Sequence, residues 1–245
     1  MSIYPEGVWA ASLRALSDSL TELEARVIRC RRCPRLVEWR HRAADQPPRR
    51  FAGQDYWARP LPGFGDPRAS LIVVGLAPAA HGGNRTGRIF TGDRSGDWLF
   101  ASLHRAGLAN QARSEHRGDG LRLNGAYVTA VNRCPPPGNR PTPTERDNCL
   151  PYLVEELRLL RRARVLVALG AFGWDGALRA AGALGHRIPR PRPSFAYARE
   201  VEIGPYVLLG SYHPSQQNTF TGKLTEEMLD RVFMRARGLA RKPRA

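Results

Sequence analysis

The chain has 245 residues, of which 42% are hydrophobic, and this is enough for one domain with a full core. No apolar run reaches membrane-spanning length, and the amino terminus, MSIYPEGVW, lacks the features of a secretory signal, so a cytoplasmic location is expected. Basic residues outnumber acidic ones by 38 to 22, giving a net charge of +16. This excess predicts a polyanionic partner and favours nucleic acid over a membrane. A genome that favours arginine codons would explain a preference for arginine over lysine among the basic residues. It would not explain so large an excess of basic over acidic residues.

The amino-terminal part is predicted to contain one helix followed by a long loop. Leucine and valine recur at three- and four-residue steps, which predicts a helix over 13–29 that leads to Cys30 and Cys33. The segment 40–66 shows no periodicity and is rich in Pro, Gly and aromatic residues, so an irregular but packed loop is expected there.

The stretch 71–98 is the centre of the predicted organisation. Its apolar run 71–74 is typical of a buried strand, and Gly75 ends it. The following glycine-rich loop carries the side chains of Asn84, Arg85, Phe90 and Asp93. Open α/β sheets bind ligands in such loops, at the carboxyl ends of their strands. The alternative is an ordinary connection between a strand and a helix.

The rest of the chain alternates predicted strands with predicted helices. Strands are expected over 126–131 and 165–169, and an antiparallel pair over 195–203 and 206–211. Helices are expected over 97–106, from 143 onward, over 171–184 and over 225–239. Thr142 and Glu145 form the pattern of a capping box for the second of these, and Pro151 should distort it. The polar piece 110–122 is expected to be a surface insertion with little structure, and the tail 241–245 to be disordered.

These elements predict an α/β fold with three layers, α/β/α, around a central, mostly parallel four-stranded sheet. One domain is expected, with an amino-terminal helix and cysteine loop (1–66), a core (67–240) and a basic tail (241–245). The carboxyl ends of parallel strands open on one side of a sheet. Loops from three strand ends should therefore bring Phe90, Asp93, Asn139 and His213 together.

The four cysteines fall into two sets, Cys30-Arg-Arg-Cys33 and Cys134 with Cys149. A CxxC pair places two thiolates on one turn, where they can share a metal with the other two. Disulfides are not expected without a secretory signal. The wide second spacing favours a 4Fe-4S cluster over structural zinc, which usually takes two tight knuckles. Zinc and four free buried thiols are the alternatives.

Each candidate site residue also has a purely structural interpretation. Phe90 could be a core aromatic, Asp93 a helix cap, Asn139 a turn residue and His213 a satisfied structural histidine. The glycine-rich loop matches neither a phosphate-binding Walker loop nor a dinucleotide fingerprint, so nucleotide cofactors are disfavoured.

Three motifs carry a resemblance to a known family: GLAPAAHGGNRTGRIFTGD, YVTAVNRCPPPGNR and YHPSQQNTFTGKLT. Together with the cysteine pattern and DYWARPLPGFGDP, they cover nearly the whole chain between Cys30 and Thr225. They resemble the uracil-DNA glycosylase superfamily, and within it the fifth family, the bacterial and archaeal type that carries an iron-sulfur cluster.

The resemblance implies an enzyme that flips a damaged base out of DNA and hydrolyses its N-glycosidic bond without an amine nucleophile, leaving an abasic site. It implies that His213 donates to a base carbonyl oxygen, and that Asp93, helped by Asn139, orients or activates water. Phe90 would stack on the flipped base. The pocket would be formed by Gly75, Leu76, Ala77, Phe90 and Ala130, and the 4Fe-4S cluster would be held by Cys30, Cys33, Cys134 and Cys149.

Two positions depart from the better-known uracil glycosylases. Ala77 stands where they have a water-activating Asp, and Ala130 where an Asn reads uracil. Loss of that Asn removes a contact to the pyrimidine edge and leaves room for a larger base. The expected substrates are therefore uracil and hypoxanthine in double-stranded DNA, with xanthine, ethenocytosine and hydroxymethyluracil as further candidates.

Contacts with DNA are expected from the first and third motifs. The loop 215–220 should enter the minor groove, with Gln217, Asn218 or Phe220 filling the gap that the base leaves, and Arg85 should also contact DNA. The arginines predict a steep salt dependence. A nucleoid-associated monomer from a bacterium or archaeon is expected. The alternatives are a non-catalytic nucleic-acid-binding module with structural zinc, and an enzyme of the same fold that acts on another nucleotide substrate.

Overall fold

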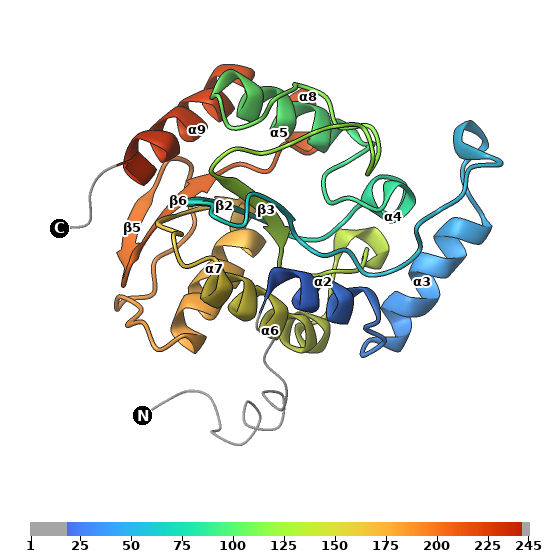
Figure 1. Cartoon of the computed structure of the whole chain (residues 1–245), viewed down its shortest axis with the longest axis horizontal. Coiled ribbons are helices and arrows are strands. Elements are labelled where there is room, and N and C mark those ends of the chain that lie inside the picture. Colours follow the sequence, from blue (N-terminus) through green and yellow to red (C-terminus); the bar gives the residue numbers. More distant parts are fainter. Residues whose placement is uncertain (1–18, 242–245) are drawn as a thin grey trace.

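A six-stranded sheet forms the centre of the computed structural model, which describes residues 19–241 (Figure 1). The strands lie in the order β1-β3-β2-β4-β6-β5. Their bounds are β1 Phe64–Gly65, β2 Leu71–Gly75, β3 Ala126–Ala130, β4 Val165–Leu169, β5 Glu200–Ile203 and β6 Tyr206–Ser211.

Strands β3, β2, β4 and β6 run parallel, as predicted, and β1 and β5 pair with them antiparallel at the two edges. The expected count of four strands was therefore too low by two: β5 is the predicted antiparallel partner of β6, whereas β1 was not predicted. The register places Gly75 opposite Ala130 and Leu169 opposite Ser211. The carboxyl ends of the parallel strands thus open along the same edge of the sheet.

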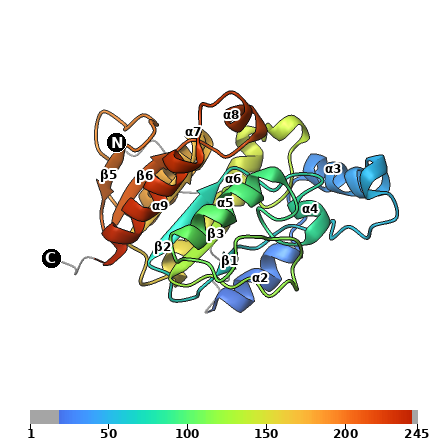
Figure 2. The same ribbon diagram turned by 90° about the horizontal axis from the view of Figure 1, so that it is seen from above.

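Helices cover both faces of the sheet and complete three layers (Figures 1 and 2). Helices α5 and α9 lie on one face, whereas α6 and α7 lie on the other, with α2 packed outside α6. The helices are α2 Leu20–Ile28, α3 Pro34–Asp45, α4 Gly83–Thr86, α5 Arg94–Arg105, α6 Pro143–Leu159, α7 Gly170–Ala183, α8 Gln216–Phe220 and α9 Glu226–Arg241. Short 3-10 turns occur at Arg49–Phe51 and Pro137–Asn139.

The continuous apolar runs of the central strands follow from burial on both faces. In β2, Leu71 and Val73 pack in the cluster under α5 and α9, whereas Ile72 and Val74 pack in the cluster under α6 and α7. Since successive side chains of a strand point to opposite faces, a strand covered on both sides needs apolar residues throughout.

The predicted capping box at the start of α6 is confirmed. Thr142 Oγ1 accepts a hydrogen bond from the backbone N–H of Glu145 at 3.2 Å, and Glu145 Oε2 accepts one from the N–H of Thr142 at 2.8 Å. Arg35 on α3 also donates to both carboxylate oxygens of Glu145. Helix α6 continues through Pro151 as a single element, so this proline does not end it.

Other elements differ from their predicted bounds for identifiable reasons. Helix α3 begins at Pro34, a favourable first residue for a helix, and extends into the segment expected to be a loop. The sequence did not predict this helix because only a few of its residues are buried, so it has no clear apolar periodicity. Strand β5 begins only at Glu200, since Ala198 has a φ of 56° that interrupts the extended backbone. The first part of the helix predicted over 13–29, and most of the predicted tail, lie outside the described residues.

Within the described part of the chain, no helix combines the length and the apolar composition needed to cross a membrane.

Candidate active site

A cavity of about 640 Å³ lies where the loops after β2, β3 and β6 meet. It brings together four of the predicted site residues from three distant motifs, namely Phe90, Asp93, Asn139 and His213. The full lining is Leu76, Ala77, Ala79, Phe90, Asp93, Arg94, Ser95, Gly138, Asn139, Arg140, His213, Ser215, Gln216 and Gln217.

Asp93 is both a helix cap and a wall of the cavity. Its Oδ1 accepts the backbone N–H of Gly96 at 3.0 Å, which starts α5 three residues earlier than the sequence predicted. Its Oδ2 packs against Gly82, where a side chain would collide with the carboxylate. Burial raises the pKa of Asp93 above its ordinary value, although the backbone hydrogen bonds partly oppose the rise. One carboxylate oxygen is thus held by the helix, and the group sits where losing its proton is unfavourable.

Phe90 stands in a strained backbone conformation beside the cavity. Its φ of 53° lies in the left-handed region, which a residue with a bulky side chain rarely adopts. The ring packs over the end of β2, where a Cβ on Gly75 would lie 2.6 Å from Phe90 Cζ. Only glycine therefore fits at the base of this ring, and the ring is held in place from below.

His213 follows β6 and faces Phe90 across the cavity wall, with ring centroids 5.7 Å apart and the planes tilted by 33°. Burial lowers the pKa of His213 to about 4, so the imidazole is neutral at neutral pH. The side-chain amide of Asn218 on α8 donates to the backbone carbonyl of His213 at 2.8 Å. A neutral imidazole in this position can present one N–H donor to a ligand in the cavity.

Asn139 lies at the exposed rim of the cavity, in the short turn that follows the proline-rich segment after β3. Its φ of 57° is left-handed, a conformation that asparagine tolerates better than most residues. Asn139 and Phe90 are thus both held in uncommon backbone conformations at one site, which is a recurring property of functional sites.

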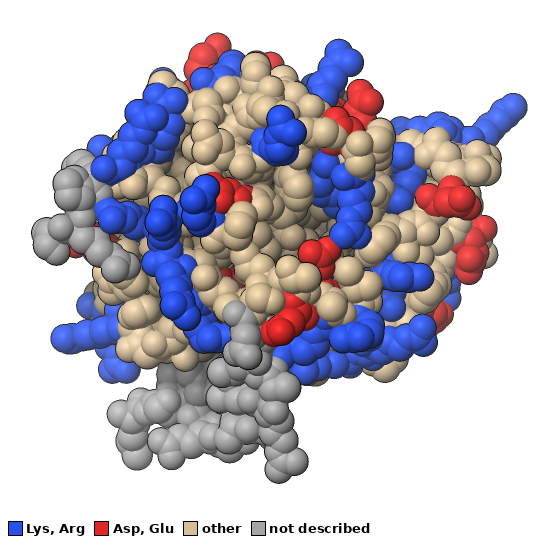
Figure 3. Space-filling view, in the orientation of Figure 1, with Lys and Arg blue, Asp and Glu red and all other residues tan. Residues whose placement is uncertain are grey.

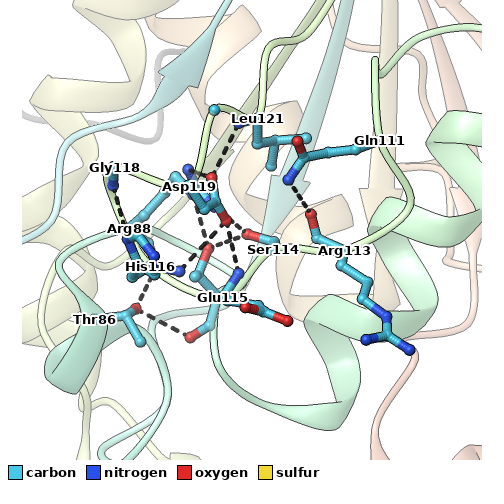
Figure 4. A network of polar contacts seen from close by, with 12 residues as sticks. Thr86, Arg88, Gln111, Arg113, Ser114, Glu115, His116, Gly118, Asp119 and Leu121 are labelled. Carbon is cyan, nitrogen blue, oxygen red and sulfur yellow. Dashed lines mark hydrogen bonds and ion pairs between the residues drawn. The ribbon is translucent and has the colours of Figure 1, made fainter.

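The polar segment 110–122 holds the first motif's loop in place through a buried ion pair (Figure 4). The guanidinium of Arg88, whose side chain is 3% exposed, donates to both oxygens of Asp119 at 2.8 and 2.5 Å and to Ser114 Oγ at 2.7 Å. Thr91 exchanges a hydrogen bond with the same serine. The segment contains neither a helix nor a longer strand, as predicted, but it supports the residues on either side of Phe90.

Several predicted site residues lie behind or beside the cavity rather than in its lining. Gly75 and Ala130 are buried neighbours at the ends of β2 and β3. Arg85 donates to the carbonyls of His81 and Gly92 in its own loop and to Gln54 Oε1 in the segment before β1. Asn218 holds the His213 backbone, and Phe220 is 68% exposed on α8.

Sequence reasoning missed several residues that line the cavity. Arg94 and Ser95 form the first turn of α5, directly after Asp93, and Gln216 begins α8. Their place next to the predicted motif residues was the available signal, because a helix that starts at a site points its first residues toward it. Arg94 also lies over the ring of Phe220, 4.5 Å from the centroid, and thus joins the first and third motifs.

The four cysteines come from four different places: the end of α2, the start of α3, the segment after β3, and α6. Burial raises the pKa of Cys134 to about 11, and the nearby thiols of Cys30 and Cys33 add to the rise. Three sulfurs have N–H donors: Arg40 approaches Cys134 Sγ at 3.2 Å, the Arg133 backbone approaches Cys149 Sγ at 3.2 Å, and Asn148 approaches Cys33 Sγ at 3.7 Å. Across residues 19–241, no group of three or more His, Cys, Asp or Glu side chains is arranged to hold a metal ion.

Basic side chains outnumber acidic ones on the visible face of the molecule, as they do in the composition. On the face in Figure 3, Lys and Arg side chains are spread widely, and acidic ones occupy fewer positions between them. A surface of this charge attracts a polyanion.

Comparison with known proteins identifies the relatives of the chain. Residues 62–237 match the family described as the uracil DNA glycosylase superfamily. The chain is similar to a type-5 uracil-DNA glycosylase of Mycobacterium bovis, with 55% identity over 226 residues that cover 91% of this chain and 83% of the relative. Proteins of the same description from Mycobacterium leprae and Thermus thermophilus are 52% and 48% identical, over 91% and 86% of this chain and 97% and 94% of their own length.

Proposed function

This chain belongs to the uracil DNA glycosylase superfamily and is a DNA glycosylase, and we propose that it hydrolyses the N-glycosidic bond of uracil flipped out of double-stranded DNA. The observation that carries this proposal is the convergence of Phe90, Asp93 and His213 on one cavity. Enzymes that act on a base must take it out of the stack into such a pocket. The interpretation as a non-catalytic binding module is set aside, because the family is one of enzymes.

His213 is suited to stabilise the departing base. When the glycosidic bond breaks, the base leaves as an anion, and negative charge gathers on its carbonyl oxygens. A neutral imidazole N–H already directed at such an oxygen stabilises this charge without first having to reorganise. The low pKa of His213 keeps the ring neutral. The ring therefore offers a directed hydrogen bond, without a positive charge that would attract any nearby anion.

Asp93 is suited to the opposite side of the reaction, where the sugar becomes cationic and water attacks. Its Oδ1 is fixed by the start of α5, which leaves Oδ2 to accept the proton of a water molecule. The raised pKa of a buried carboxyl makes it a stronger base than an exposed aspartate. Asn139, at the rim of the same cavity, can help to position that water.

The substrate range is proposed to extend beyond uracil. The cavity volume of about 640 Å³ lies within the roughly 300–1,000 Å³ typical of small-molecule sites, and the short side chain of Ala77 lines it. No large side chain at position 130 narrows the end of β3 behind it. Hypoxanthine is the first further substrate we propose, followed by xanthine, ethenocytosine and hydroxymethyluracil.

The region around α8 is proposed to meet the DNA. Gln217 lines the cavity, and the exposed ring of Phe220 projects from the end of the same short helix. An apolar or amide side chain of this kind can enter a duplex and replace the flipped base in the stack. We propose that the protein is a monomer and that it acts on the bacterial chromosome.

We further propose that Cys30, Cys33, Cys134 and Cys149 hold a 4Fe-4S cluster. Four thiolates are the ligand set of such a cluster, and N–H groups directed at three of the sulfurs are the donors that stabilise it. Each thiolate of a cluster binds a different iron, so its cysteines are spaced more widely than those around one zinc ion. When bound, the cluster would tie α2 and α3 to α6 and would take no part in the hydrolysis.

One set of assays tests these proposals. Purified protein is incubated with duplexes containing uracil, hypoxanthine or only normal bases, and alkali-labile sites are counted. Release of uracil by the wild type, strongly reduced in both Asp93→Asn and His213→Gln, is expected, and a protein that binds the duplex but releases no base would refute the activity. Absence of hypoxanthine release would refute the wider range alone. Iron and sulfide analysis with a visible spectrum tests the cluster, since zinc is colourless.

A further inference from the structure

A second cavity, of about 600 Å³, adjoins the cavity lined by Phe90, Asp93 and His213. The two share Ala79, Asp93, Arg94, Gly138, Asn139 and Gln216 in their linings. The walls that belong only to the second cavity come from the amino-terminal part of the chain, the first motif, α5 and the segment after β3: Trp39, Arg50, Phe51, Ala80, His81, Gly82, Gly92, Asp97 and Pro136. A ligand in this cavity would therefore lie next to whatever fills the first one.

The wall around His81 is a built structure rather than a chance gap between loops. Tyr56 Oη lies 3.0 Å from His81 Nδ1, and the ring of Phe51 stacks against the imidazole at 6.4 Å. Arg85 packs over the other side of this group, 4.2 Å from the Phe51 centroid, and its Nε donates to the His81 carbonyl at 2.9 Å. Both the backbone and the ring of His81 are thus fixed in position.

The contact with Tyr56 bears on which nitrogen of His81 carries a proton. Burial raises the pKa of Tyr56, so the phenol keeps its proton and can donate a hydrogen bond to Nδ1. Burial, together with Arg50 and Arg85, lowers the pKa of His81, so the imidazole is neutral. When Nδ1 accepts from Tyr56, the proton of the neutral ring is on Nε2, which can donate to a ligand.

The cavity also has positive charge. Arg50 is exposed, and no carboxylate within residues 19–241 forms an ion pair with it. Arg94 lines the same cavity, as do the carboxyl groups of Asp93 and Asp97. The guanidinium and imidazole N–H groups match the oxygens of an anionic ligand.

From this arrangement, we infer that the second cavity binds the phosphodiester of the nucleotide next to the flipped one, with Arg50 and His81 as the groups that recognise it. This inference rests on the proposed function, because the flipped nucleotide defines which phosphate lies nearby. A phosphate held there fixes the strand at the point where the backbone must turn to present the base to Asp93 and His213. Phosphate contacts of this kind position a nucleic acid without reading its sequence.

The test measures coupling between one protein group and one DNA phosphate. Wild-type protein, Arg50→Gln and His81→Ala are titrated with duplexes carrying a stable abasic analogue, in which single phosphates on either side are replaced by neutral methylphosphonates. We expect one replacement to weaken wild-type binding by about tenfold, the usual effect of losing a hydrogen bond to a charged group. The same replacement should weaken binding by Arg50→Gln, and by His81→Ala, less than about twofold, because its partner is already gone.

Arg49→Gln is the matched control, since Arg49 is an exposed arginine in the same turn but does not line the cavity. It should respond to each methylphosphonate as the wild type does. The inference would be overturned if every methylphosphonate replacement weakened binding equally for the wild type and Arg50→Gln. It would also be overturned if free inorganic phosphate competed with the duplex for the cavity while no methylphosphonate replacement weakened wild-type binding. Base release from a uracil duplex is measured separately, so a failure of the proposed activity is distinguishable from a failure of this contact.

Discussion

Replacing Asp119 with asparagine tests whether the segment 110–122 supports the first motif's loop. The change keeps the shape of the side chain but removes the charge that faces Arg88, whose side chain is 3% exposed. It also puts at risk the backbone N–H groups of Glu115 and Leu121, which donate to the same carboxylate at 2.7 and 3.0 Å. An unpaired guanidinium would then remain inside the protein.

The expected cost is large for a single substitution. Removing one partner of a buried ion pair typically destabilises a protein by about 3–5 kcal/mol. For a chain of this size each kcal/mol lowers Tm by about 2–4 °C, so Asp119→Asn should melt on the order of 6–20 °C below the wild type. Because Ser114 and Thr91 connect this pair to Phe90 and Asp93, the variant should also release uracil up to about 10²-fold more slowly at temperatures where it is folded.

The pH dependence of unfolding gives the sign of the effect. Burial acts to raise the pKa of Asp119, but the hydrogen bonds from Arg88 and two backbone N–H groups outweigh it and hold the pKa well below 3.8. A carboxyl with a lowered pKa stabilises the fold above its ordinary pKa and loses that contribution as pH falls toward the lowered value. The Tm gap between wild type and Asp119→Asn should therefore be full at neutral pH and shrink in acid.

Thermal unfolding followed by circular dichroism measures both quantities, with Glu38→Gln as the control. Glu38 pairs with Arg42 at the surface, where both side chains are more than half exposed, so its loss should cost about 0–1 kcal/mol. If Asp119→Asn melted within a degree or two of this control, the segment would be an ordinary surface loop and the reasoning would fail.

The remaining predictions concern the chemistry and the DNA. His213→Gln should lower the single-turnover rate of uracil release by about 10²–10³-fold with little change in the Kd for an abasic duplex, and an equal loss in both would show a binding role instead. Base release by the wild type should slow as the pH falls toward the pKa of Asp93, which is raised above 3.8, because a protonated carboxyl cannot accept a proton from water. A rate that stayed constant down to pH 3.8 would contradict this role. Raising salt from about 50 to 200 mM should weaken duplex binding about 10³-fold or more if six or more phosphates are contacted, whereas a change under about threefold would remove the electrostatic interpretation.

The position of the site followed from the sequence because it depends on topology. Apolar runs separated by helices predict parallel strands, and parallel strands place their following loops at one edge. Phe90, Asp93, Asn139 and His213 could therefore be placed together, and one cavity does join them. The chemical role of each of these four residues stays a prediction until the variants are measured.

The features that sequence reasoning missed depend on contacts without local periodicity. Helix α3 buries Leu36, Arg40 and Ala43, and one arginine among so few buried residues hides the apolar face. The Arg88–Asp119 pair joins residues 31 apart, and no pattern within either segment identifies its partner. Arg85 donates to the carbonyls of His81 and Gly92 and to Gln54, contacts that its charge alone did not indicate, and its contact with DNA stays a prediction.

The hydrogen bond from Asn218 to the His213 carbonyl joins two tasks in one short piece of chain. The helix proposed to meet the duplex begins three residues after the histidine proposed to stabilise the departing base, so neither can shift alone. Substitutions on α8 that change the affinity for DNA will consequently alter the reaction rate as well. To change the two properties separately, the hydrogen bond from the Asn218 amide must first be replaced.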